Sequence, residues 1–193
     1  MQTEAPLARL LGTLFYTSPS SETVTAILHE FGQQQHELLN ALADSASQNS
    51  VDELETDFFT LLQGGGDMPC PPWGSAYLDN ENALFGASTL EYRAFLNALG
   101  LQCDTGVREP EDHIGLMLML LSVLWENGDE YNARVLLQTH LLPFAYVMLE
   151  EMQKHAQTAF YQNLALFTEN WLKMVAEESN IEPANRRIYW ERI

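Results

Sequence analysis

Basic residues are missing from a long part of this sequence. No Lys or Arg occurs between residues 10 and 92, and the chain of 193 residues carries 9 basic residues against 27 acidic ones, a formal net charge of -18. Such a field repels phosphate groups, so we expect neither nucleic acids nor anionic membrane surfaces as partners. Composition leaves two interpretations of the acidic surface open: solubility alone, or attraction of a cationic ligand such as an arginine-rich peptide.

Cysteine is scarce, and signals for export or membrane insertion are missing. Cys70 and Cys103 are too few for a disulfide framework and lack metal-ligand spacing, which favours reduced thiols. The first residues show no basic region followed by an apolar core, so they do not resemble a signal peptide. The longest apolar run, residues 114–125, is too short for a bilayer, which needs about 20 residues. We expect a cytoplasmic protein with no integral membrane segment.

The usual signatures of enzymes are also absent. A glycine run is followed by Asp67 rather than by the Lys-Ser/Thr of a phosphate-binding loop. His113 has Met117 where a zinc protease needs its second histidine, and Cys70 has no cationic neighbour in sequence. A hydrolase that used Asp112 and His113 as an acid/base pair would lack a nucleophile. We therefore expect no enzymatic activity, no metal and no cofactor.

Helical periodicity dominates the chain and predicts an all-α fold. Apolar residues recur three and four positions apart from Leu7 to Phe15, and this spacing returns in most later segments, whereas no segment alternates as a strand does. We expect one domain, residues 1–193, built as a bundle of about nine helices. Its predicted boundaries are caps at Ser20 or Ser21, at Ser50 and at Ser88 or Thr89, a loop at residues 44–50, a helix start at residues 109–112, and ends near Pro19, Gly100, Asn127 and Pro143.

One segment cannot be helical because it is rich in glycine and proline. Residues 64–75 combine the glycine run with three prolines, and they are followed closely by large apolar side chains. Trp73 and Tyr77 are the most prominent of these. Such side chains either fill the core or form the floor of a groove for an apolar peptide.

Carboxylates gather at the start of the most apolar helix. Glu109, Glu111 and Asp112 flank Pro110 and precede His113. In one interpretation they cap the helix, because carboxylates satisfy free amides in a first turn. In the other they form a polar rim that receives a guanidinium, while His113 bonds to a peptide backbone. Beside an aromatic groove, such a rim suits a peptide with paired arginines followed by an apolar stretch.

These segments resemble a known family. Glu109–Gly115 is similar to the E-x-x-D-H signature of the TorD/DmsD/NarJ-type chaperones. Pro71–Asp79, together with Leu84–Gly86, resembles the second block of that family, particularly in its DmsD branch. Leu10–Tyr16 is similar to the first helix of the same branch, and the resemblance extends roughly over residues 7–171.

The resemblance implies an all-helical TorD/DmsD-like chaperone without catalysis. Members bind the twin-arginine leader of a molybdenum-cofactor oxidoreductase, such as dimethyl sulfoxide reductase, and hold it back from Tat export until the cofactor is inserted. The implied partners are the twin-arginine signal peptide of the catalytic subunit of a molybdoenzyme and components of the Tat translocase. The implied leader-binding residues are Trp73, Tyr77, Glu109, Pro110, Asp112 and His113, with Phe58, Leu61 and Leu62 in the fourth helix.

The sequence departs from the family in two places. Phe58–Leu62 stands where the family has an aromatic-x-Arg-Leu-Phe run, without its arginine and final aromatic residue, and the glycine run replaces a more ordinary turn. These departures bear on the identity of the client rather than on the fold. The alternative function is a helical adaptor that binds a folded partner without leader recognition.

Overall fold

The computed structural model describes residues 2–64, 68–80, 85–102, 106 and 109–190. Residues 65–67 of the glycine loop and Cys103 lie outside them. In the described residues the one pairing outside helices is an isolated antiparallel bridge between Trp73 and His113, so the predicted all-α class is confirmed. The α-helices are α1 (Ala5–Tyr16), α2 (Glu22–Phe31), α3 (Glu37–Ser47), α4 (Val51–Phe58), α5 (Ser75–Leu78), α6 (Ala87–Ala98), α7 (Ile114–Glu126), α8 (Glu130–Val135), α9 (Leu142–His155) and α10 (Ala159–Glu178), with a 3-10 turn η1 (Gln2–Glu4) and π-helical turns η2 (Phe59–Gln63) and η4 (Leu136–Leu141).

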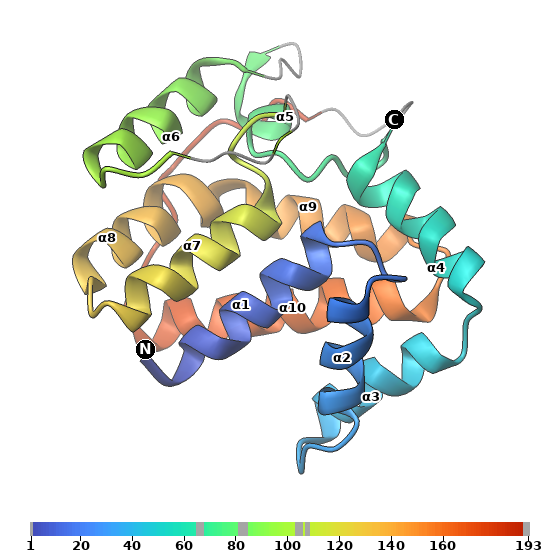
Figure 1. Cartoon of the computed structure of the whole chain (residues 1–193). Coiled ribbons are helices and arrows are strands. Elements are labelled where there is room, and N and C mark those ends of the chain that lie inside the picture. The colour runs from blue at the N-terminus through green and yellow to red at the C-terminus, as the bar shows by residue number, and fades with distance from the viewer. Residues whose placement is uncertain (1, 65–67, 81–84, 103–105, 107–108, 191–193) are drawn as a thin grey trace.

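The helices form a bundle around two central pairs (Figure 1). α1 packs along α7, and α9 packs along α10. α2 and α3 contact each other at one end of the bundle, where α3 leans on α10. The short α5 and α6 lie at the opposite end of the view, and α5 contacts α9. The C-terminal segment returns from α10 past α6 towards α5 (Figure 1).

The α1–α7 pair is tight because two glycines face each other. A Cβ atom on Gly12 would lie 2.6 Å from the carbonyl oxygen of Gly115, and a Cβ on Gly115 would lie 2.8 Å from that of Gly12. Neither distance is possible for a real side chain, so only glycine lets the two backbones approach this closely. The crossing brings the start of α7 against the end of α1.

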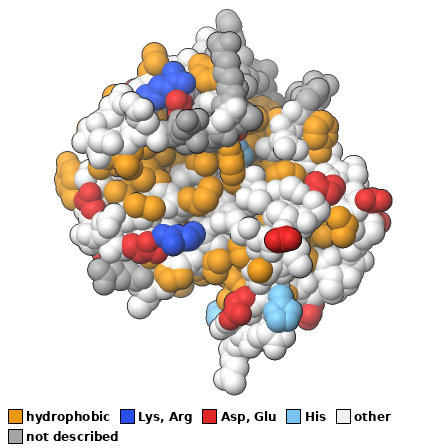
Figure 2. Space-filling model, in the orientation of Figure 1, with side chains coloured by type: hydrophobic (Ala, Val, Ile, Leu, Met, Phe, Trp, Pro, Cys, Tyr) orange, Lys and Arg blue, Asp and Glu red, His pale blue; other side chains and the backbone are white. Residues whose placement is uncertain are grey.

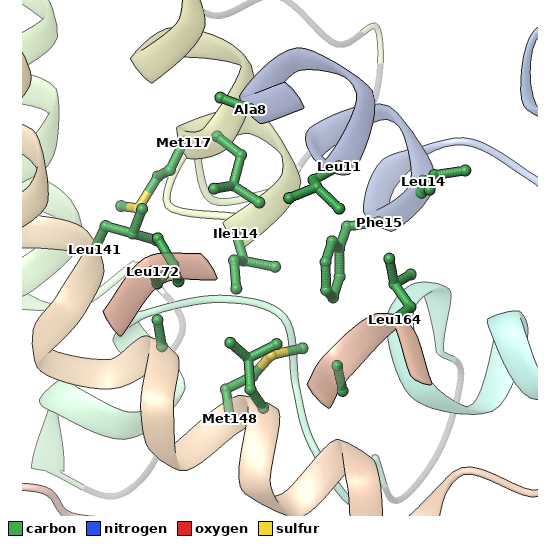
Figure 3. Close-up of a cluster of buried hydrophobic side chains, with 14 of the residues drawn as sticks. Ala8, Leu11, Leu14, Phe15, Ile114, Met117, Leu141, Met148, Leu164 and Leu172 are labelled. Atoms are coloured by element: carbon green, nitrogen blue, oxygen red, sulfur yellow. The ribbon is translucent and has the colours of Figure 1, made fainter. Parts of the chain in front are cut away.

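The core is continuous between these helices (Figure 3). Its side chains come from α1, α7, η4, α9 and α10, which explains why the apolar spacing recurs along most of the chain. The figure labels Ala8, Leu11, Leu14, Phe15, Ile114, Met117, Leu141, Met148, Leu164 and Leu172, all of them buried.

Several predicted boundaries are confirmed. Ser21 caps α2 by accepting a hydrogen bond from the Val24 amide at 3.1 Å. Ser50 and Glu53 form a reciprocal capping box at the start of α4. α6 ends just before Gly100, whose φ of +71° suits a residue without a Cβ. These signals are local, and for that reason they can be read from sequence.

Other predicted boundaries are wrong. The predicted loop at residues 44–50 is helical up to Ser47, because α3 continues through it. α7 starts at Ile114 rather than within residues 109–112, so those residues precede the helix instead of forming its first turn. The predicted boundary near Pro143, by contrast, is confirmed within two residues: η4 ends at Leu141 and α9 starts at Leu142, with Pro143 in its first turn, where the missing amide costs nothing.

The first turns of two helices receive a carboxylate from outside the helix. Ser88 and Thr89 lie inside α6 and do not cap it, contrary to expectation. Asp79 accepts hydrogen bonds there from the Ser88 amide at 3.0 Å and from the Ser88 hydroxyl at 2.6 Å. Asp57 of α4 does the same for α10, with the Thr158 amide at 2.8 Å and hydroxyl at 2.7 Å. A buried carboxylate therefore joins each pair of segments.

The glycine crossing gives a first prediction. Gly115→Ala should lower the free energy of unfolding by about 1–3 kcal/mol, because the added methyl group must push α1 and α7 apart. Gly32→Ala is the matched control, since a Cβ there meets nothing closer than 3.5 Å. Urea unfolding of both variants measures the difference, and equal stability of the two would show that the crossing tolerates a methyl group.

Candidate functional site

Two segments far apart in sequence meet in the candidate site. The glycine–proline loop (residues 64–75) and the carboxylate segment (residues 109–113) run antiparallel where Trp73 pairs with His113. The Gly74 amide donates to the Asp112 carbonyl at 3.0 Å, and the Ile114 amide donates to the Pro72 carbonyl at 2.8 Å. The two segments that carry the family resemblance thus form one wall.

Asp112 is buried behind this wall. Its Oδ2 accepts a hydrogen bond from the Ser75 amide at 2.6 Å, at the start of α5. One interpretation predicted that Asp112 caps the helix that follows it. Asp112 does bond to the start of a helix, but that helix is α5 rather than α7. Its Oδ1 has no hydrogen-bond partner among the described residues. Burial raises the pKa of the Asp112 carboxyl to about 6, and the bond from Ser75 opposes the shift.

His113 is a buried, neutral N-cap. Its Nδ1 accepts a hydrogen bond from the Gly115 amide at 3.0 Å, at the first turn of α7. Its ring lies between those of Tyr16 and Trp73, edge-on to both, with centroid distances of 5.1 and 5.8 Å. Burial lowers the pKa of His113 to about 3, while a hydrogen bond with the Leu62 carbonyl acts in the opposite direction. His113 therefore carries no charge at neutral pH.

The remaining carboxylates point to different partners. Tyr16 donates its hydroxyl to Glu109 Oε1 at 2.5 Å, which ties the rim to α1. Arg93 Nε donates to both oxygens of Glu111 at 2.8 Å and ties the rim to α6. Pro110 between them is buried. Glu109 and Glu111 thus hold the segment in place, and both stay partly exposed.

The aromatic loop side chains differ in burial. Trp73 is half-buried and lies at the wall. Tyr77 on α5 is fully buried, between the ring of Phe144 at 5.8 Å and the ring of Trp190 at 5.2 Å. Tyr77 is therefore covered by the C-terminal segment, which carries Trp190.

The three candidates in the fourth helix face inward. Phe58, Leu61 and Leu62 are all buried, and the ring of Phe58 lies 6.4 Å from that of Tyr161. Only Leu62 reaches the wall, through its carbonyl and His113. The structure brings five of the predicted residues together: Trp73, Glu109, Pro110, Asp112 and His113. Tyr77 is buried beneath them on α5.

Sequence reasoning missed two contributors. Glu91 of α6 forms an ion pair with Arg186 of the C-terminal segment. Both residues line one small cavity together with Asp112. Nothing in the spacing of Glu91 marks it. The only available signal was that Arg186 and Arg187 are the one adjacent basic pair in the chain.

A large apolar hollow among the described residues lies elsewhere, between α1, α3 and α10. Leu38, Leu166 and Met174 are exposed at its edge. α3, which contributes to its lining, lies at the opposite end of the view from α5 and α6 (Figure 1).

The described residues include no group of three metal-ligating side chains, and none of their helices is both long and apolar enough to cross a membrane. Cys70 is buried, and burial raises the pKa of its thiol, which makes the thiol a poor nucleophile.

Comparison with known proteins identifies the family. Residues 26–172 match the family described as the nitrate reductase delta subunit. The Tat proofreading chaperone DmsD of Salmonella typhi is 41% identical over 168 residues, with 83% of this chain and 82% of that protein covered. A DmsD of Haemophilus influenzae is 37% identical, with 94% of both chains covered. The chain belongs to the TorD/DmsD family of redox-enzyme maturation chaperones. The predicted resemblance is therefore confirmed.

A solved structure shows the same fold. A redox enzyme maturation protein of Archaeoglobus fulgidus superposes with a TM-score of 0.62 at 19% identity, covering 88% of this chain and 93% of that one. At this identity the likeness concerns the helical arrangement alone. The TorD/DmsD chain described here thus keeps its family's architecture.

The buried carboxyl gives a second prediction. The folded protein holds the Asp112 proton more tightly than the unfolded chain does, so Asp112 favours folding more at low pH and less as pH rises through 6. The free energy of unfolding, relative to Asp112→Asn, should therefore fall by on the order of 2 kcal/mol from about pH 4 to about pH 7.

Urea unfolding of both proteins across this pH range is the measurement. His113 titrates in both proteins, so its contribution cancels in the difference. A difference that stays constant with pH would mean that Asp112 ionises as an ordinary exposed carboxyl.

Proposed function

We propose that this chain is a cytoplasmic Tat proofreading chaperone that binds the twin-arginine leader of a molybdoenzyme precursor. It acts as a single domain, without catalysis, and holds the leader until the enzyme is mature. The observation that carries the proposal is the joining of the two family segments in one wall at Trp73 and His113. The names of its relatives, Tat proofreading chaperone DmsD and chaperone TorD, support the same function.

The chemistry of the wall suits a guanidinium. Asp112 Oδ1 is buried without a hydrogen-bond partner among the described residues. An arginine that reached it would supply a charge-assisted hydrogen bond, which is about twice as strong as a neutral one. Neutral His113 does not repel such a cation. Trp73 supplies an apolar face beside it for the residues that follow the arginines.

The surface charge suits a cationic leader as well. Acidic side chains are scattered over the face shown in Figure 2, with few basic ones among them. The net charge of -18 would draw a leader with paired arginines towards the protein before contact. Contact with translocase components is part of the proposal, although it needs a surface other than the wall.

The wall gives a third prediction. Trp73→Ala should weaken binding of a twin-arginine leader peptide by about 2 kcal/mol, which is roughly 30-fold in Kd. Tyr131→Ala is the control, because Tyr131 is 76% exposed on α8, away from the wall. Calorimetric titration measures both, with circular dichroism to show that each variant is folded. If folded Trp73→Ala binds as tightly as the control, Trp73 serves packing only.

The charge gives a fourth prediction. The association rate of the leader peptide should fall about tenfold or more as the Debye length shrinks from about 30 to about 8 Å with added salt. A peptide with Gln-Gln in place of Arg-Arg should show little dependence. Stopped-flow fluorescence measures both rates. Equal dependence for the two peptides would remove the steering role from the acidic surface.

A further inference from the structure

The C-terminal segment, residues 181–190, has no regular secondary structure and is nevertheless packed on the protein. The Ala184 amide donates to the Gln138 carbonyl at 2.8 Å, and the Tyr189 amide donates to the Tyr77 carbonyl at 2.8 Å. Ile188 and Trp190 pack against the hydrophobic core. The segment is therefore an extended peptide held in a groove by backbone bonds and alternate side chains.

The order of side chains in this segment matches the ligand of the proposed function. Arg186 and Arg187 are adjacent, and the three apolar or aromatic residues Ile188, Tyr189 and Trp190 follow. A twin-arginine leader presents the same order, an arginine pair and then an apolar stretch.

The arginine pair lies on the acidic side of the candidate site. Arg186 forms an ion pair with Glu91 of α6. Arg186 and Glu91 line a small cavity together with Asp112 and His140. The pKa of His140 is lowered to about 4, first by burial and then by Arg186. Its ring is therefore neutral and does not compete with a cation for the carboxylates that line the cavity. The guanidinium of Arg187 lies 4.8 Å from the ring centre of Tyr189.

The apolar part of the segment covers the predicted floor of the groove. The ring of Trp190 lies 5.2 Å from that of Tyr77, which is fully buried. This covering explains why a predicted leader-binding residue has no exposed surface.

The fit of the segment is incomplete. Buried polar atoms without a hydrogen-bond partner among the described residues gather beneath and within it, although each such atom disfavours the closed state. They are Tyr77 Oη, Asp112 Oδ1 and Trp190 Nε1. A ligand that satisfied several of them would bind better than the segment does.

We infer that the C-terminal segment is an internal substitute for the leader: it fills the leader-binding groove with its own arginine pair and aromatic residues, and a bound leader displaces it. The inference rests on the proposed function. It also names the ligand class of the groove, an extended peptide in which one arginine takes the place of Arg186 beside Glu91. Because the groove is open only part of the time, the apparent affinity for a leader is reduced by that fraction.

The test uses full-length Arg186→Gln. The ion pair with Glu91 is solvent-exposed, with side-chain exposures of 30% and 51%, so its loss should leave the melting temperature nearly unchanged. It should loosen the segment and tighten binding of a twin-arginine leader peptide about two- to fivefold. Lys173→Gln is the matched control, since it removes one positive charge from an exposed ion pair on α10. Trp190→Ala, which uncovers Tyr77, is the second variant and should have the same effect.

A second measurement follows the segment itself. Hydrogen exchange on wild-type protein should show that saturation with the leader peptide removes the protection of the Ala184 and Tyr189 amides. The contrary outcome is that the leader binds while these amides stay protected, with Arg186→Gln binding no better than Lys173→Gln. In that case the C-terminal segment does not occupy the leader-binding groove, and the proposed function stands. If no variant binds the leader peptide, the proposed function fails and the inference fails with it.

Discussion

The contact between the backbones of Gly12 and Gly115 fixes how the start of α7, and with it His113, lies against α1. It sets α7 against α1 at a distance that no side chain permits. The start of α7 then places His113 beside Tyr16, and the Tyr16 hydroxyl reaches Glu109. The rim of the site is thus positioned by a crossing in the core, and a site that must hold a peptide in one register benefits from such a rigid base.

Three buried carboxylates, those of Asp57, Asp79 and Asp112, accept hydrogen bonds from the starts of helices, whereas buried Glu151 pairs with the basic side chain of Lys154. Asp57 and Asp79 both lie in the long stretch of sequence without Lys or Arg. Asp57 accepts amides at the start of α10, Asp79 at the start of α6, and Asp112 at the start of α5. Because the positive end of a helix favours a carboxylate, these contacts stabilise the fold without using basic residues. Asp112 Oδ1 has no hydrogen-bond partner among the described residues, and burial raises the pKa of the Asp112 carboxyl.

What could be predicted from sequence follows the range of each interaction. The caps at Ser21 and Ser50 were predictable because donor and acceptor are three residues apart. The cap of α6 was not, since Asp79 reaches it from outside the helix and Ser88 offered a plausible local substitute. The pairing of Trp73 with His113 joins segments far apart in sequence, so the sequence suggested an aromatic groove beside a polar rim but not this contact. The pairing of Glu91 with Arg186 had no local pattern at all, because it joins residues 95 positions apart.

The anchoring of the C-terminal segment bears on selectivity. Arg134 donates to the carbonyls of Ser179 and Asn180, so the segment leaves α10 from a fixed point. A short tether of this kind keeps a released segment at an effective concentration in the millimolar range. Any incoming peptide must compete with the tethered segment, whose effective concentration does not change when the protein is diluted. Stray basic peptides at micromolar levels would be excluded, whereas a precursor whose leader makes the full set of contacts would be admitted. The segment therefore acts as an affinity threshold built into the chain.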